Sequence, residues 1–123
     1  MPPRDPRDQL PLTPVVLHIL LALTSGERHG YAIAQEVEET TNAQIRMGPG
    51  TLYGSIQRML AASLIEEVPQ HKRTDDAPSG EERRRYYRMT AFGRGVLDVE
   101  LERLSNVMQL AKQKQLLRDP SIA

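Results

Sequence analysis

Apolar residues recur every three or four positions in four segments of this chain, which is the spacing of amphipathic helices. The first segment follows Thr13 and Pro14, a typical N-cap and first helical position, and ends at Gly26. The second runs from Arg28 to Thr40. Its inward-facing residues are expected to be Tyr31, Ile33, Ala34 and Val37, with glutamates on the outer face.

A Gly-Pro-Gly break at positions 48–50 separates the second predicted helix from the third. From there, Leu52, Ile56, Met59 and Leu60 form one apolar face. The opposite surface carries small, neutral or basic side chains: Thr51, Tyr53, Gly54, Ser55, Gln57, Arg58 and Ala62. Such a helix fits the DNA major groove, which is about 12 Å wide, because Arg can hydrogen-bond guanine and Gln can hydrogen-bond adenine.

The helical spacing of apolar residues ends after the third predicted helix. Leu64–Val68 and the segment RYYRMT at 85–90 have the composition of short strands, and the polar residues 69–84 between them predict a long loop. The order helix, helix, helix, strand, loop, strand is that of a winged helix-turn-helix. We therefore expect a mainly α (α+β) fold in which the third helix enters the major groove and a two-stranded wing reaches the backbone or the minor groove.

The last predicted helix begins after Thr90 and has an apolar seam at steps of four, three, four and three. The seam consists of Leu97, Leu101, Leu104, Met108 and Ala111. A three-helix core is too small to cover so long an apolar helix, so the pattern favours pairing with a second copy of the chain. Folding back onto the first helix is the alternative.

These patterns divide the chain into three parts. Residues 1–12 are rich in proline and charge without periodicity and predict a flexible N-terminal arm. Residues 13–90 form the winged-helix DNA-binding domain, and residues 91–123 form the dimerisation helix and tail.

Charge is distributed unevenly, although 16 basic and 16 acidic residues give a formal net charge of zero. No acid lies between Thr40 and Ile65, and the predicted wing is rich in arginine. The candidate phosphate contacts are Arg46, Lys72, Arg73, Arg83, Arg84 and Arg85. At the start of the second helix, His29 and Tyr31 could add hydrogen bonds to an anion, although Tyr31 could equally belong to the core.

Enzymatic chemistry finds little support in the sequence. The chain has no cysteine, and GPGTLYGS lacks the GK[ST] ending of a phosphate-binding loop. His18 on an apolar helix is typical of a core residue rather than a ligand. We therefore predict no catalytic residue, no metal and no cofactor. The apolar run VVLHILLAL is much shorter than the ~20 residues of a membrane span, so we expect a buried helix and no membrane partner. The absence of cysteine suits a reducing compartment, and we expect a cytoplasmic protein.

Four segments in the right order resemble the PadR family of transcriptional regulators: HGYAIAQEV, PGTLYGSIQRML, LIEE and RRYYRMTAFGRGVL. The resemblance implies a winged helix, a C-terminal dimerisation helix and repression from a palindromic operator. It also implies that Thr51, Tyr53, Ser55, Gln57 and Arg58 contact double-stranded DNA beside the wing. Gly54 and Ser63 depart from the family pattern, which usually has Pro and Gly at these positions.

Two questions stay open at this stage. A small apolar or aromatic effector is a candidate partner, but a binding mode that sandwiches flat aromatic drugs between tryptophans, as in some members, does not transfer to a chain without tryptophan. The alternative function is a winged-helix protein-interaction module without specific DNA binding, which the zero net charge favours slightly.

Overall fold

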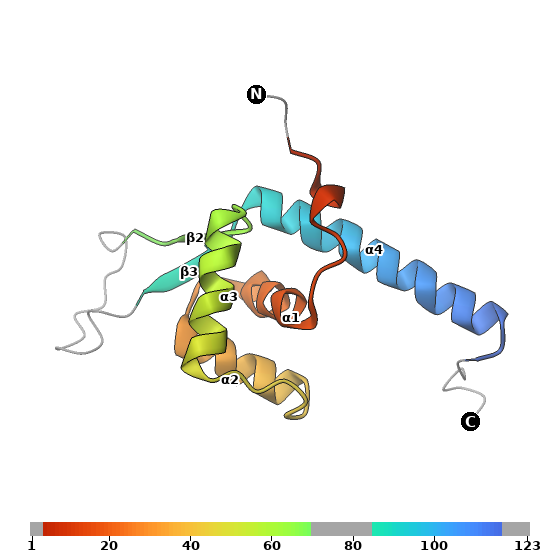
Figure 1. The fold of residues 1–123 in the computed structure, drawn as a ribbon, viewed down its shortest axis with the longest axis horizontal. Helices are drawn as coiled ribbons and strands as arrows, with labels where there is room; N and C mark the ends of the chain where they lie inside the picture. Colours follow the sequence, from red (N-terminus) through yellow and green to blue (C-terminus); the bar gives the residue numbers. More distant parts are fainter. Residues whose placement is uncertain (1–3, 70–84, 117–123) are drawn as a thin grey trace.

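The computed structural model describes residues 4–69 and 85–116, within which three helices pack around one core and a fourth extends away from it (Figure 1). The helices of the core are α1 (Pro14–Ala22), α2 (Gly30–Thr40) and α3 (Pro49–Ala61), and the long helix is α4 (Ala91–Gln113). The strands are β1 (Arg28–His29), β2 (Ile65–Glu67) and β3 (Tyr86–Met89). This is the expected winged-helix order.

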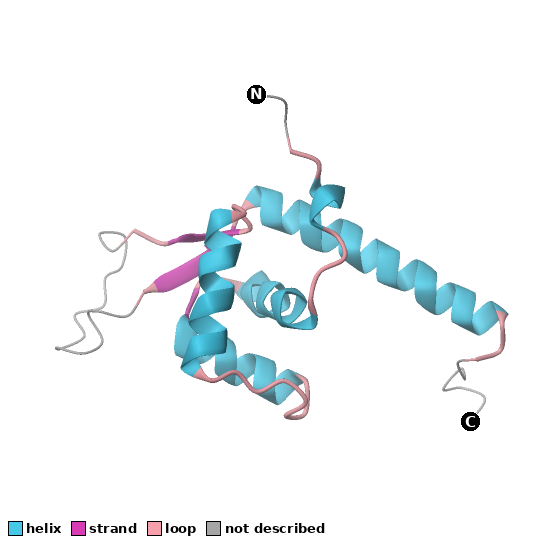
Figure 2. Cartoon of the chain, viewed as in Figure 1, coloured by secondary structure: helices cyan, strands magenta, loops and turns pink. Residues whose placement is uncertain are grey.

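The sheet has three strands in the order β1-β3-β2 (Figure 2), one more than the two-stranded wing predicted. Both pairings are antiparallel, with Arg28 opposite Tyr87 and Ile65 opposite Met89. Arg28 was predicted to start the second helix, but it lies in β1. His29 then caps α2, because its Nδ1 accepts a hydrogen bond from the backbone N–H of Ala32 at 3.2 Å.

The core lies between the three short helices, the sheet and the start of α4. The side chains that fill it come from all four α-helices and from strands β2 and β3: Ile19, Leu20, Ile33, Val37, Leu52, Ile56, Met59, Ile65, Tyr87, Val96 and Leu97. Two expectations about the core were wrong. Tyr31, placed inward, is 67% exposed. Leu97, assigned to the dimer seam, is 1% exposed within a single chain, so it belongs to this core and cannot contact a partner.

The predicted flexible arm has a defined place from residue 4 onward. Pro6–Gln9 form a single 3-10 turn that packs against α4. The backbone N–H of Leu12 donates to the Glu100 carboxylate at 2.9 Å, and the guanidinium of Arg4 lies 4.8 Å from the centre of the Phe92 ring. Glu100 is itself 1% exposed and accepts two hydrogen bonds from Arg103.

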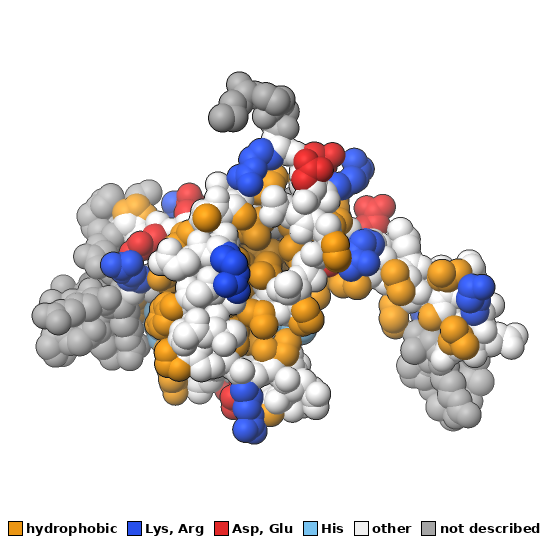
Figure 3. Space-filling view, in the orientation of Figure 1, with side chains coloured by type: hydrophobic (Ala, Val, Ile, Leu, Met, Phe, Trp, Pro, Cys, Tyr) orange, Lys and Arg blue, Asp and Glu red, His pale blue; other side chains and the backbone are white. Residues whose placement is uncertain are grey.

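Helix α4 begins where predicted. Thr90 Oγ1 accepts a hydrogen bond from the Gly93 N–H at 2.9 Å, and the first turns are buried against the core. Beyond Glu100 the helix leaves the domain and presents apolar side chains to solvent (Figure 3). The exposed ones are Leu101, Val107, Met108 and Leu110, followed by Leu116 after the helix. No helix in the described part of the chain is long and apolar enough to cross a membrane.

Candidate nucleic-acid interface

The interface is built around the start of α3. Gly48 occupies the N-cap position and Pro49 the first helical position, so no N-cap side chain accepts a hydrogen bond from the first-turn N–H groups. The first backbone bond of the helix runs from the Leu52 N–H to the Gly48 carbonyl at 2.9 Å. Exposed N–H groups at a helix start attract anions, phosphates among them. The glycine-proline break therefore starts the helix and leaves this end open to a ligand.

The outward face of α3 agrees with the sequence prediction at four of its five site residues. Thr51, Tyr53, Gln57 and Arg58 are exposed. Ser55 is 1% exposed, so the prediction that it lies on this surface was wrong. Its hydroxyl accepts a hydrogen bond from Arg58 Nη2 at 3.2 Å. Ser55 therefore orients the arginine instead of contacting a ligand itself.

Gly54 also affects the placement of Arg58. A Cβ atom at position 54 would lie 3.6 Å from Arg58 Nη1, so the guanidinium lies beside the glycine on the helix surface. The hydrogen bond to Ser55 therefore holds the guanidinium of Arg58 against α3, beside Gly54. This limits the rotamer freedom that a base contact would otherwise cost.

Tyr53 packs across the start of α2. A Cβ atom at Gly30 would lie 2.9 Å from the Tyr53 hydroxyl oxygen, so the ring can adopt this position only because residue 30 is glycine. The neighbouring His29 ring is stacked on Tyr31 at 6.4 Å between centroids and meets the edge of Tyr86 at 5.4 Å. The fold therefore brings His29, Tyr31 and Tyr53 to one side of the molecule, beside the face of α3.

The predicted phosphate contacts are only partly described. Arg46 and Arg85 are exposed, and each lies near a glutamate: Arg46 is 3.9 Å from Glu38 and Arg85 is 3.8 Å from Glu67. Such long, exposed ion pairs are worth little and break readily. Lys72, Arg73, Arg83 and Arg84 lie outside the described residues.

The wing strands carry a second ion pair, which the sequence analysis did not single out. Arg88 on β3 lies 2.8 Å from Glu66 on β2, directly across the antiparallel register. Beside it, burial raises the pKa of the Tyr87 hydroxyl, and the charge of Glu67 adds to the effect. The described base of the wing therefore carries acids beside its arginines, in exposed pairs that break readily.

No metal-binding site is found in residues 4–69 and 85–116, because no group of three His, Asp or Glu side chains there is placed to hold an ion. The arrangement is that of a binding surface. It consists of an open helix start, an exposed α3 face without acids and a β wing beside it.

The fold is that of a winged-helix protein with an exposed, acid-free third helix. The chain belongs to the PadR-like family of transcriptional regulators, whose family model matches residues 17–99. The resemblance inferred from the four sequence segments is thereby confirmed.

Solved structures agree on the fold. A PadR family transcription regulator from Clostridium difficile superimposes with a TM-score of 0.66 at 24% identity, covering 82% of this chain and 97% of the other. A PadR-like transcriptional regulator from Bacillus cereus gives a TM-score of 0.66 at 20% identity, covering 85% of this chain and 93% of the other.

Curated relatives are themselves uncharacterised. A protein encoded in transposon TN4556 of Streptomyces fradiae is 30% identical over 72% of this chain, and the match spans only 22% of that longer protein. A protein of Lysinibacillus sphaericus is 29% identical over 75% of this chain and 79% of its own length.

Proposed function

We propose that this protein is a sequence-specific repressor that binds a palindromic operator as a homodimer and acts by occupying the DNA. The observation that supports this most strongly is the face of α3. Thr51, Tyr53, Gln57 and Arg58 are exposed together, without an acid among them, next to the open start of the helix. Two such helices related by a two-fold axis would lie in successive major grooves about 34 Å apart. A repressor that binds chromosomal DNA would work in the cytoplasm, which we propose as its location.

Dimerisation would use the second half of α4. Leu101 and Met108 of the predicted seam are exposed, Leu104 and Ala111 are half-buried, and Val107 and Leu110 widen the apolar surface. Apolar side chains that repeat with this spacing on an unpartnered helix are typical of a helix-helix interface. The half of α4 that packs on the core would hold each DNA-binding domain at a fixed angle to the pair.

Base recognition is tested by an alanine substitution at Arg58. We expect Arg58→Ala to weaken binding to the selected operator by about 30-fold or more, since a good base contact contributes ~1–3 kcal/mol and the homodimer loses one such contact in each copy. Arg94→Ala is the matched control, because Arg94 is also an exposed helical arginine but pairs with Asp98 on α4. Equal operator affinity of the two variants in a fluorescence anisotropy titration would place the reading surface elsewhere.

Backbone contacts are tested by salt. The arginines and lysines assigned to phosphates should give a plot of log affinity against log salt with a slope of roughly −0.9 for each phosphate neutralised. The same titration should give a smaller slope for Arg46→Ala, because that variant loses one candidate contact in each copy.

A protein-interaction module is the second candidate function. The wing pairs observed in the structure favour it, because Arg85 and Arg88 each lie near a glutamate of β2. Binding to DNA that is absent, or insensitive to salt, would support this alternative over the repressor.

We also propose that a small apolar or aromatic effector releases the operator. In the simplest mechanism it binds along α4 and changes the spacing of the two α3 helices. Such a ligand must bind free and DNA-bound protein with different affinities, because a ligand that binds both equally shifts nothing.

A further inference from the structure

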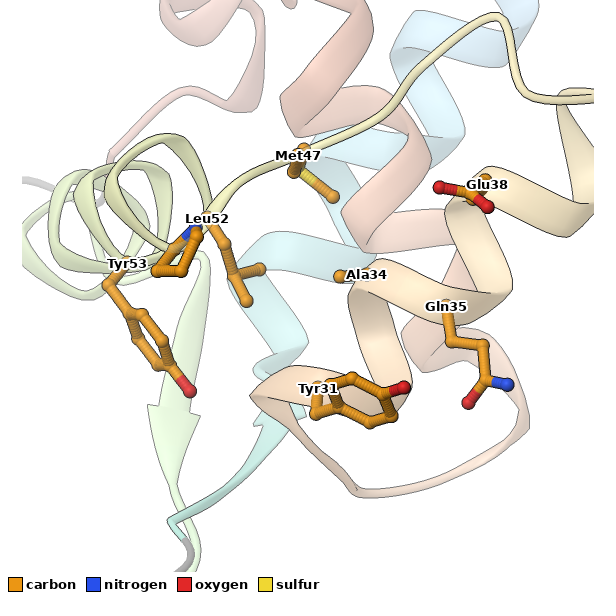
Figure 4. Close-up of a pocket in the computed structure, with 8 residues that line it drawn as sticks. Tyr31, Ala34, Gln35, Glu38, Met47, Leu52 and Tyr53 are labelled. Atoms are coloured by element: carbon orange, nitrogen blue, oxygen red, sulfur yellow. The ribbon is translucent and has the colours of Figure 1, made fainter.

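A cleft of about 410 Å³ opens between α2 and the start of α3 (Figure 4). This volume falls within the range of small-molecule sites, ~300–1,000 Å³. The cleft is formed by four residues of α2, one residue of the linker and three residues of α3: Tyr31, Ala34, Gln35, Glu38, Met47, Pro49, Leu52 and Tyr53.

Its walls suit a flat ring. Leu52 is buried and Ala34 and Met47 are half-buried, so the inner surface is apolar. Tyr53 on α3 points its hydroxyl end toward Tyr31 on α2, whose own hydroxyl end points toward Gln35, and Leu52 and Ala34 lie above both rings in the view (Figure 4). Two exposed tyrosine rings around an apolar floor can pack against an aromatic ligand and attract a cation.

The charge of the cleft selects the sign of the ligand. Among the lining residues that the structure describes, Glu38 alone is charged. It lies in the last turn of α2, where the helix dipole also favours a cation. Its neighbour Arg46 stands 3.9 Å away with 72% of its side chain exposed. So loose a pair gives way at little cost to a better-placed ammonium group.

The spacing of the lining residues sets the length of the ligand. Tyr31, Gln35 and Glu38 are at positions i, i+4 and i+7 of α2 and so lie along one side of the helix. Seven residues at 1.5 Å each make the distance along the axis about 10 Å. With ~3 Å taken by a hydrogen bond from the amine to the carboxylate, about 7 Å is left between the ring and the amine, which is the reach of a four-carbon tether.

We propose that this cleft binds a small aromatic primary amine, with its ring between Tyr31 and Tyr53 and its ammonium group on the Glu38 carboxylate. Gln35 supplies a further hydrogen-bonding group between the two ends. The consequence for DNA rests on the proposed function. Tyr31 and Tyr53 also belong to the candidate nucleic-acid interface, so a bound amine and DNA exclude each other. This release needs no change in the dimer angle.

The binding step is tested without DNA. Isothermal titration of the full chain with 4-phenylbutylamine should show binding, whereas 5-phenylpentanoate, of similar shape and opposite charge, should not bind. Glu38→Gln should weaken amine binding about tenfold or more, because a charge-assisted hydrogen bond is lost. Glu39→Gln removes the same charge from α2 outside the cleft and should leave the affinity unchanged. Circular dichroism verifies that both variants fold.

Two results would overturn the ligand site. One is equal binding of the amine and the carboxylate. The other is an equal affinity of the Glu38→Gln and Glu39→Gln variants for the amine. The tyrosines are tested by Tyr31→Ala, which should weaken amine binding, and by Tyr31→Phe, which keeps the ring and should retain it.

The exclusion of DNA is tested separately. The amine should raise the apparent dissociation constant of the operator for the unaltered protein and for Glu39→Gln, but much less for Glu38→Gln. An amine that binds without displacing the operator would refute the proposed competition between amine and DNA, but it would still support the ligand site. A protein that binds the amine and no DNA would refute the proposed function alone, since the titration needs no DNA.

Discussion

Replacing Gly93 with alanine tests how α4 is attached to the winged-helix domain. A Cβ atom at position 93 would lie 2.0 Å from the Leu64 carbonyl oxygen, a backbone atom that cannot rotate away. Carbon–oxygen contacts are normally at least ~3.3 Å, so α4 and the start of β2 must separate by about 1 Å. The same Leu64 oxygen accepts hydrogen bonds from the Thr90 N–H and hydroxyl, both at 3.1 Å.

The magnitude follows from these contacts. Overpacking costs ~1–3 kcal/mol or more, and each strained hydrogen bond adds ~0.5–1.5 kcal/mol. The higher helix propensity of alanine offsets only ~0.5–1 kcal/mol of this cost. We expect Gly93→Ala to lower the free energy of unfolding by about 3 kcal/mol, which corresponds to a Tm lower by about 10 °C or more.

Gly95→Ala is the matched control for this experiment. A Cβ atom there would meet only Pro6 Cγ, at an ordinary 3.5 Å, so the substitution should stabilise the helix by ~0.5–1 kcal/mol. Thermal unfolding is followed by circular dichroism at one protein concentration, because dimer stability depends on concentration. If the two variants unfold at the same temperature, the close contact between α4 and Leu64 does not exist in solution.

Three further predictions concern α4. Glu100→Ala should cost ~1–3 kcal/mol in urea unfolding, because the Leu12 N–H loses its acceptor; a cost no larger than that of Glu102→Ala would contradict the docked arm. The pKa of the Glu100 carboxyl lies below its ordinary 4.5, chiefly because Arg103 donates to it. Stability is therefore expected to fall as pH drops below 4.5, because the unfolded chain binds the proton first. In Glu100→Gln, the urea midpoint of unfolding should depend less on pH in this range. Leu110→Glu should convert the proposed dimer to a monomer in sedimentation experiments, whereas Gln109→Glu should not; a dimer that persists in Leu110→Glu would show that the interface lies elsewhere.

The helices could be predicted because their apolar positions follow one period. The errors arise where that period is not the deciding factor. Tyr31 lies two positions before Ile33, which is about 200° around the helix axis, so it could not share the buried face. Ser55 is small enough to be buried at the edge of the apolar face, next to Ile56, where its polarity suggested exposure.

Long-range contacts explain the remaining differences. Strand β1 has two residues and exists because β3 pairs with it. Arg28 lies opposite Tyr87, 59 positions later, and His29 lies opposite Tyr86, 57 positions later, which no local pattern reveals. The arm is positioned by Glu100, 88 residues after Leu12. The cleft between α2 and α3 depends on how two helices cross. The α3 surface, in contrast, could be predicted at Tyr53, Gln57 and Arg58 because it needs only the helical period and the absence of acids.

The most direct test of the proposed function is selection of DNA fragments from a random duplex pool by the purified protein, followed by sequencing. We predict enrichment of one sequence with two inverted half-sites, whose centres lie about one helical turn apart or a multiple of it. Arg58→Ala should lose preference at defined positions within each half-site. A pool that shows no enrichment, or enrichment that Arg58→Ala leaves unchanged, would contradict the assignment of α3 as the reading helix.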